Sequence, residues 1–191
     1  MRLFVAVNFP ATLRARLWEA TEPLRAMQLP VRWVAQDGMH LTLKFLGETD
    51  EHRLGELGDA LDRAVAGVRS MPVTVEGFGA FPDAAHPSVI WAGVVTDPAL
   101  ELLQHGVEQA FGPLGFPPEG RPFRPHVTLG RLGRLGRSRR ESPRGAFRVL
   151  EEALDALIWS ETADVTSVEL MKSTTRKGGA VYEEVRHGRL S

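Results

Sequence analysis

The chain has 191 residues, of which 43% are hydrophobic and 25% are charged, and its formal net charge is −1. This composition predicts a globular protein with a sizeable core and excludes a disordered chain. No cysteine is present, which excludes disulfides, thiolate metal ligands and a cysteine nucleophile, and which is typical of a reducing compartment.

The N-terminal half alternates short strands with amphipathic helices. Its first apolar run stops at Asn8 and Pro10, too early for a signal peptide or a membrane span, so we expect a soluble cytoplasmic protein without a membrane partner. Hydrophobic periodicity and turn signals predict, in chain order, strand 3–7, helix 11–27, strands 31–35 and 40–46, helix 51–68, strands 72–81 and 88–95, and helix 99–111.

The C-terminal half begins with a loop rich in proline and glycine, 112–125, and continues into a strand at 126–132. A helix is predicted over 143–157, and the alternating segments 163–173 and 180–190 are typical of a closing hairpin. The elements lack the regular spacing of parallel βαβ units. The fold class we predict is therefore α+β with mainly antiparallel sheets.

One short segment occurs twice. HLTLKFLG at 40–47 and HVTLGRLG at 126–133 agree at five positions, including the histidine and the threonine two residues after it. Side chains at i and i+2 share one face of a strand, so His40 with Thr42, and His126 with Thr128, project together while the leucines and valine between them face a core. The repeat predicts two matching lobes with one histidine each.

Two facing histidines can supply acid–base chemistry. Because the ordinary pKa of histidine is about 6.5, one imidazole can accept a proton while the other donates one near neutral pH. The threonine hydroxyls can donate hydrogen bonds to phosphoryl oxygens. This set suits in-line attack of water on a phosphodiester and requires no metal ion or other cofactor.

The paired motifs, together with RLFVAV, the WV that precedes His40, and IWAGV, resemble the two-histidine (2H) phosphoesterases. The chain is most similar to their RNA 2′,3′-cyclic phosphodiesterases, also called 2′-5′ RNA ligase-like proteins. The resemblance implies that residues 1–191 form a single phosphodiesterase domain with HxTx motifs at 40–43 and 126–129. It also implies a bilobal fold, with two pseudo-symmetric lobes, each with an antiparallel sheet and flanking helices, and an active cleft between them.

The same resemblance implies the reaction. A terminal 2′,3′-cyclic phosphate of RNA would be hydrolysed to a 2′-phosphate without a cofactor. His40 would be the proton donor to the leaving 3′ oxygen and His126 the proton acceptor that activates water, while Thr42 and Thr128 would bind the phosphate. We expect a monomer whose partners are RNA ends or related nucleotides.

Further residues are candidates for substrate binding. Arg131 could bind phosphate, although strand alternation places its side chain on the other face of the strand from His126 unless the strand bulges. Arg137, Arg139 and Arg140 belong to a run of arginines that could bind the RNA backbone, or could form a solvated loop in a chain with 3 lysines among its 23 basic residues. Phe123, Trp33 and Tyr182 could each stack on a base or ribose, but aromatic residues beside strands are more often part of the core, and Phe123, in the loop before His126, is the strongest candidate. The remaining histidines, 52, 86, 105 and 187, show no spacing typical of metal ligands.

Several functions remain open on the sequence alone. The same site could act on small cyclic nucleotides or on 2′-5′-linked oligonucleotides, and could ligate RNA ends in reverse. A binding module for RNA ends or nucleotides without turnover is a second class, although arginine, lysine and aromatic residues would serve binding better than two histidines.

Overall fold

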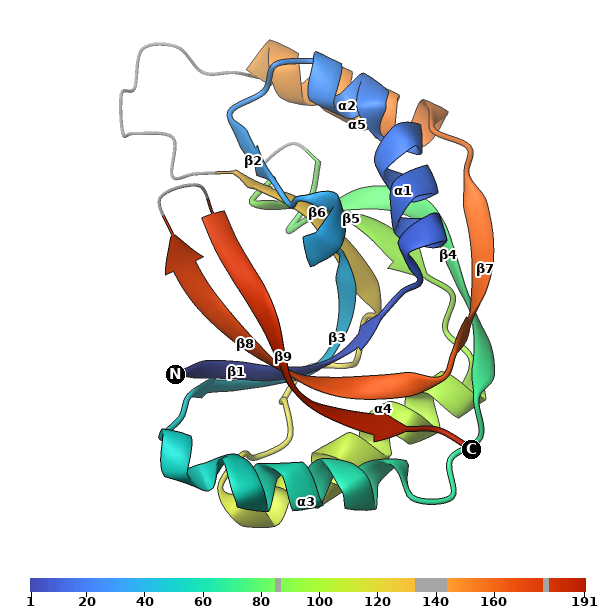
Figure 1. Cartoon of the computed structure of the whole chain (residues 1–191). Helices are drawn as coiled ribbons and strands as arrows, with labels where there is room; N and C mark the ends of the chain where they lie inside the picture. Colours follow the sequence, from blue (N-terminus) through green and yellow to red (C-terminus); the bar gives the residue numbers. More distant parts are fainter. Residues whose placement is uncertain (85–86, 133–143, 177–178) are drawn as a thin grey trace.

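The structure, a computed structural model, describes residues 1–84, 87–132, 144–176 and 179–191 (Figure 1). Within these ranges the strands are β1 (Arg2–Asn8), β2 (Val31–Trp33), β3 (His40–Glu48), β4 (Met71–Phe81), β5 (Val89–Val94), β6 (His126–Leu132), β7 (Ser160–Val165), β8 (Ser167–Arg176) and β9 (Gly179–Arg189). The α-helices are α1 (Ala11–Ala20), α2 (Glu22–Ala26), α3 (Leu54–Val65), α4 (Pro98–Phe111) and α5 (Arg144–Ala156).

The described strands form one antiparallel sheet made of two halves. Its order is β7-β4-β5-β6-β3-β1-β8-β9, with β2 paired to β6 beside β3. The halves meet between β6 and β3, where the register consists of the single pair Leu41 and Val127. The predicted α+β class with antiparallel sheets is therefore confirmed, and the two sheets are joined into one at this pair.

The helices cover the outer faces of this curled sheet. Helices α3 and α4 pack together, α3 against β8 and β9 and α4 against β3 and β4, while α1, α2 and α5 lie near β4 and β7 (Figure 1). The buried aliphatic residues of the strands form one large cluster with those of the helices, with Leu41 and Val127 in it at 0% exposure. The alternation predicted for the two motif strands is therefore confirmed.

Two predicted elements differ from the structure. The helix predicted over 11–27 is two helices that meet at Thr21, because Pro23 has no N–H to donate and its ring clashes with the preceding turn. The strand predicted over 163–173 is two strands separated by Thr166. Here the chain leaves β4 in one half of the sheet and joins β1 in the other. The predicted closing hairpin corresponds to β8 and β9.

None of the described helices is long and apolar enough to cross a membrane.

Candidate active site

The two motifs lie side by side at the junction of the two half-sheets. Antiparallel pairing of Leu41 with Val127 places His40 next to Thr128, and Thr42 next to His126. The aliphatic partners are buried, while all four polar side chains are partly exposed on the opposite face. The fold thus gathers into one group the four residues that the sequence predicted as catalytic.

Both imidazoles are held by the same local arrangement. Nδ1 of His40 lies 2.7 Å from the carbonyl oxygen of Gly38, and Nδ1 of His126 lies 2.7 Å from that of Arg124. A carbonyl oxygen only accepts, so each Nδ1 carries the hydrogen and donates it. In the neutral ring Nε2 is then unprotonated and can accept a hydrogen bond or a proton from a ligand.

An aromatic ring also supports each histidine edge-on. The Tyr182 ring lies 4.9 Å from that of His40 at 79°, and the Phe81 ring lies 5.1 Å from that of His126 at 84°. Phe4 packs against His40 as well, at 4.8 Å. These contacts and the carbonyl hydrogen bonds fix the orientation of both rings before any ligand binds.

The surroundings favour the neutral form of both histidines. Burial lowers the pKa of His40 from 6.5 to about 4; the Gly38 carbonyl opposes this shift, and the charges of Arg131 and His126 add to it. Burial also lowers the pKa of His126, against the Arg124 carbonyl and with the help of Arg131. Without a bound anion, both rings are therefore ready to accept a proton, and one must gain a proton to act as an acid.

A bulge after each motif turns the next side chains. In β3, Thr42 and Lys44 pair with two consecutive residues of β1, so Leu43 between them is an extra residue without a partner. In β6 the same step passes from Thr128 to Gly130 against β5, with Leu129 as the extra residue. Each bulge reverses the strand's parity beyond it.

The bulge therefore places Arg131 on the same face of β6 as His126 and Thr128. Simple alternation would have placed it on the other face. Arg131 is exposed and lowers the pKa of both histidines, so it lies near both. Phe45 takes the matching place in β3, with 60% of its surface exposed. Sequence analysis missed Phe45, although its alignment with Arg131 in the repeat was a signal that could have found it.

Two cavities adjoin the motif residues. One, of about 690 Å³, includes His40 in its wall, and the other, of about 1000 Å³, includes His126. Four residues line both cavities: Thr42, Phe45, Thr128 and Arg131. Both volumes are of the size that small ligands occupy. Each of the two cavities can therefore hold a nucleotide next to the residues that they share.

The other predicted residues lie at different distances from this centre. Phe123 lines the larger cavity, while Trp33 and Tyr182 line the smaller one; all three also pack against buried side chains. Arg137, Arg139 and Arg140 lie outside the described residues. Sequence analysis also missed Arg121 and Arg124, which line the larger cavity, and Arg2 and Arg32, which line the smaller one.

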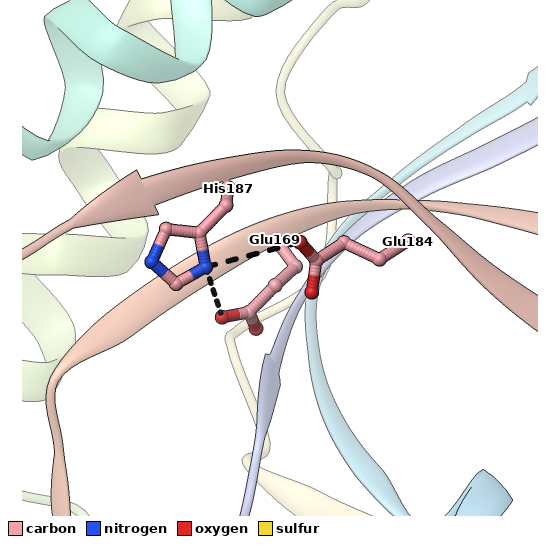
Figure 2. A group of neighbouring side chains, drawn as sticks. All are labelled: Glu169, Glu184 and His187. Carbon is pink, nitrogen blue, oxygen red and sulfur yellow. Dashed lines mark ion pairs between the residues drawn. The ribbon is translucent and has the colours of Figure 1, made fainter.

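A separate group of ionisable residues lies on β8 and β9, where sequence spacing had indicated nothing. Glu169, Glu184 and His187 have potential ligand atoms within 4.8 Å of one another (Figure 2). Nδ1 of His187 lies 3.6 Å from Glu169 and 3.9 Å from Glu184. The Glu169 carboxylate already accepts hydrogen bonds from Ser167 and the Asn8 N–H, so we assign the group a structural role.

Comparison with known proteins gives a consistent family. The sequence matches the model of the 2′-5′ RNA ligase superfamily over residues 13–176. An RNA 2′,3′-cyclic phosphodiesterase of Thermus thermophilus is 39% identical, covering 95% of this chain and 86% of that protein. A protein of the same name from Methanothermobacter thermautotrophicus is 28% identical, covering 100% and 99%.

Solved structures are similar over the full length. The Thermus thermophilus protein TT0787 superposes with a TM-score of 0.78 at 26% identity, covering 100% of this chain and 98% of that one. Escherichia coli LigT complexed with 3′-AMP gives a TM-score of 0.71 at 26% identity, with the same coverage. These similarities agree with the resemblance inferred from the two motifs.

Proposed function

Because the chain belongs to the 2′-5′ RNA ligase superfamily, we propose that it hydrolyses 2′,3′-cyclic phosphate ends of RNA to 2′-phosphomonoesters. One observation carries the proposal: two histidines on adjacent strands each donate Nδ1–H to a backbone carbonyl and keep Nε2 for a ligand. A phosphate between them would meet one proton acceptor and one proton donor. The junction of the two half-sheets in this site also supports a single phosphodiesterase domain over residues 1–191.

The reaction follows from the roles of the two rings. His126 takes a proton from water through Nε2 while the water oxygen forms a bond to phosphorus. The bond from phosphorus to O3′ breaks on the opposite side, and His40, protonated at Nε2, gives its proton to O3′. The products are a 2′-phosphate and a free 3′-hydroxyl. His40 ends neutral and His126 protonated, so solvent proton exchange restores the starting state.

Neighbouring groups stabilise the charge that develops on the phosphoryl oxygens. Thr42 and Thr128 donate their hydroxyl hydrogens to these oxygens, and the guanidinium of Arg131 binds them with two N–H groups. The bound anion also raises the pKa of the histidine beside it, which opposes the effects of burial and of Arg131. Substrate binding thereby supplies the protonated form that His40 needs.

Aromatic side chains beside this centre suit a nucleobase. Phe45 is the most exposed of them and borders both cavities, so we assign it the stacking position. Phe123, at the loop side of the larger cavity, is a second stacking candidate. We assign Trp33 and Tyr182 a structural role in the wall of the smaller cavity, since both pack against buried side chains.

Reverse ligation is a second candidate function because of the cavity of about 1000 Å³ next to His126. The hydroxyl of a second RNA end could take the place of water there and lose its proton to His126. No ATP is needed, since the cyclic phosphate is already activated.

The test uses an RNA oligonucleotide ending in a 2′,3′-cyclic phosphate, with EDTA present. We expect a 2′-phosphate product, identified by ³¹P NMR, and a bell-shaped dependence of kcat/KM on pH. His40→Ala and His126→Ala should each lower kcat by about a hundredfold or more. The matched control is His52→Ala, because His52 is exposed and lines neither cavity.

A substrate with a 4-nitrophenolate leaving group separates the two roles. This leaving group needs no proton, so His40→Ala should recover most of its activity and His126→Ala should not. Recovery in His126→Ala instead would exchange the two roles. Full activity of both single variants on RNA would rule out two-histidine catalysis.

A further inference from the structure

The smaller cavity, beside His40, carries more positive charge than one phosphate requires. Arg2, Arg32 and Arg131 line it, from three different strands. Among the described residues of its wall there is no aspartate or glutamate. Arg131 also borders the second cavity and belongs to the reacting phosphate, so Arg2 and Arg32 remain without a role in the proposed reaction.

Arg32 faces another arginine directly. In the pairing of β2 with β6, Arg32 is opposite Arg131. Like charges at directly opposed strand positions repel each other and destabilise the pair. Within the described part of the chain, neither guanidinium makes an ion pair or a hydrogen bond with a carboxylate. An anion bound at Arg32 would remove this repulsion, and a polyanion could occupy both positions together.

Arg2 lies further from the reacting centre along β1. Ala6 of this strand pairs with Thr42. Arg2 lies four positions before Ala6, which corresponds to about 13 Å of strand. A phosphate held between Thr42 and Thr128 therefore leaves Arg2 free to bind a different one. Its partner on β8 is Ser173, which lines the same cavity.

Strands β8 and β9 form part of the wall of this cavity beside Arg32. A Cβ atom built on Gly179 would lie 3.9 Å from Cδ of Arg32, so the start of β9 passes close to the arginine. Thr175 of β8 also lines this cavity. Two arginines and two residues with hydroxyl groups thus line a cavity that also includes His40.

We propose that Arg2 and Arg32, with the hydroxyls of Ser173 and Thr175, form a second subsite that binds RNA backbone phosphate on the 5′ side of the terminal nucleotide. This inference rests on the proposed function, in which His40 protonates O3′. The terminal ribose then lies on the His40 side, and its 5′-phosphate continues into the cavity that Arg2 and Arg32 line. The subsite makes the enzyme selective for an RNA chain over a mononucleotide.

The test compares substrates that differ by one phosphate. Adenosine 2′,3′-cyclic phosphate is assayed with and without a 5′-phosphate, together with the dinucleotide ApA ending in a 2′,3′-cyclic phosphate. In the wild-type protein the 5′-phosphate and the internal phosphodiester should each lower KM by about tenfold. Arg32→Gln and Arg2→Gln should each reduce this advantage severalfold, measured for each variant as the ratio of its KM values with and without the additional phosphate.

The matched control is Arg63→Gln, an exposed arginine of α3 that lines neither cavity and loses the same charge. Arg32→Lys should keep part of the advantage because it keeps the charge. An advantage that is absent in the wild type, or that survives in both glutamine variants, overturns the subsite. A gain from the 5′-monoester without one from the dinucleotide overturns the assignment to RNA backbone.

Binding separates this inference from the proposed function. Calorimetry with adenosine 2′-phosphate and adenosine 2′,5′-bisphosphate measures the contribution of the second phosphate without any turnover. If no substrate is hydrolysed, the proposed function fails, while an affinity gain that depends on Arg32 still supports the subsite. Equal affinities for the two compounds overturn the subsite even when hydrolysis occurs.

Discussion

At the scale of single residues, strand alternation correctly predicted the directions of the four motif side chains and failed for the residues that follow each motif. His40, Thr42, His126 and Thr128 follow from strand alternation. Arg131 does not, because its direction depends on a bulge that the letters HVTLGR do not reveal. Phe45 was missed for the same reason. A repeated motif identifies the polar set, whereas the backbone irregularity after it decides what surrounds that set.

Removing the charge of Arg131 tests its proximity to both rings. Because this charge lowers the pKa of His40 and of His126, Arg131→Ala should raise both values, as followed by NMR titration of the imidazole protons. The same change should lower kcat/KM for a cyclic phosphate by about a hundredfold, since it removes a charged hydrogen-bond donor to the transition state.

Arg69→Ala is the control for this change, since Arg69 is exposed and lines neither cavity. Histidine pKa values that stay at their wild-type positions in Arg131→Ala would contradict the placement of the guanidinium.

At the scale of elements, the bulge in β3 turns a lysine into the interior. Simple alternation would have put Lys44 beside His40 and Thr42. It is instead 1% exposed, and its Nζ donates to the carboxylate of Glu108 on α4 and, at 2.9 Å, to the carbonyl oxygen of Pro117. The predicted loop 112–125 is therefore fastened to the sheet before it reaches His126. The sequence could not show this, because pattern reading assigns a lysine to the surface.

Loss of this lysine should affect both stability and substrate binding. Lys44→Met leaves the Glu108 carboxylate buried without its cation, which should cost about 3–5 kcal/mol in the free energy of unfolding measured with urea. It also releases Pro117 and the loop that carries Phe123, so KM should rise more than kcat falls.

The double variant Lys44→Met with Glu108→Leu should regain most of the stability, because an apolar pair can replace a buried ion pair. Wild-type stability in the single variant would refute the importance of the ion pair.

At the scale of the whole molecule, the two halves with antiparallel strands could be anticipated from the repeat, but the contacts that connect them could not. Glu169 of β8 accepts a hydrogen bond from the Asn8 N–H of β1 at 3.1 Å and faces His187 of β9 (Figure 2). Residues 8, 169 and 187 come together only through strand pairing across the chain. Spacing along the sequence carries no signal for such a group.

This group should make stability depend on pH. Burial, with Glu184 adding to it, raises the pKa of Glu169 above 4.5, against the hydrogen bonds from Ser167 and Asn8 and the charge of His187. The folded state therefore holds this proton more tightly than the unfolded chain. Its contribution to the free energy of unfolding is present below about pH 4.5 and is lost as the pH rises through the raised value.

Glu169→Gln should remove this dependence. The variant should gain stability relative to the wild type as the pH rises from about 4.5, as measured by denaturant unfolding at several pH values. His40 acts in the opposite direction in both proteins, since its pKa of about 4 removes stability as the pH falls below 6.5. A constant difference between the two proteins across this range would contradict the shift at Glu169.

The pair of bulges also explains how a molecule of two like halves can tell the ends of its substrate apart. A frame with perfect two-fold symmetry would offer the same surroundings to a phosphate turned either way round. At the positions that follow the bulges, however, one half carries the flat ring of Phe45 and the other the cation of Arg131. A nucleotide has a base at one end and an anion at the other, so we expect it to settle in one orientation. Because the two bulges are alike but are followed by different side chains, the two sides of the cleft differ and can orient a substrate.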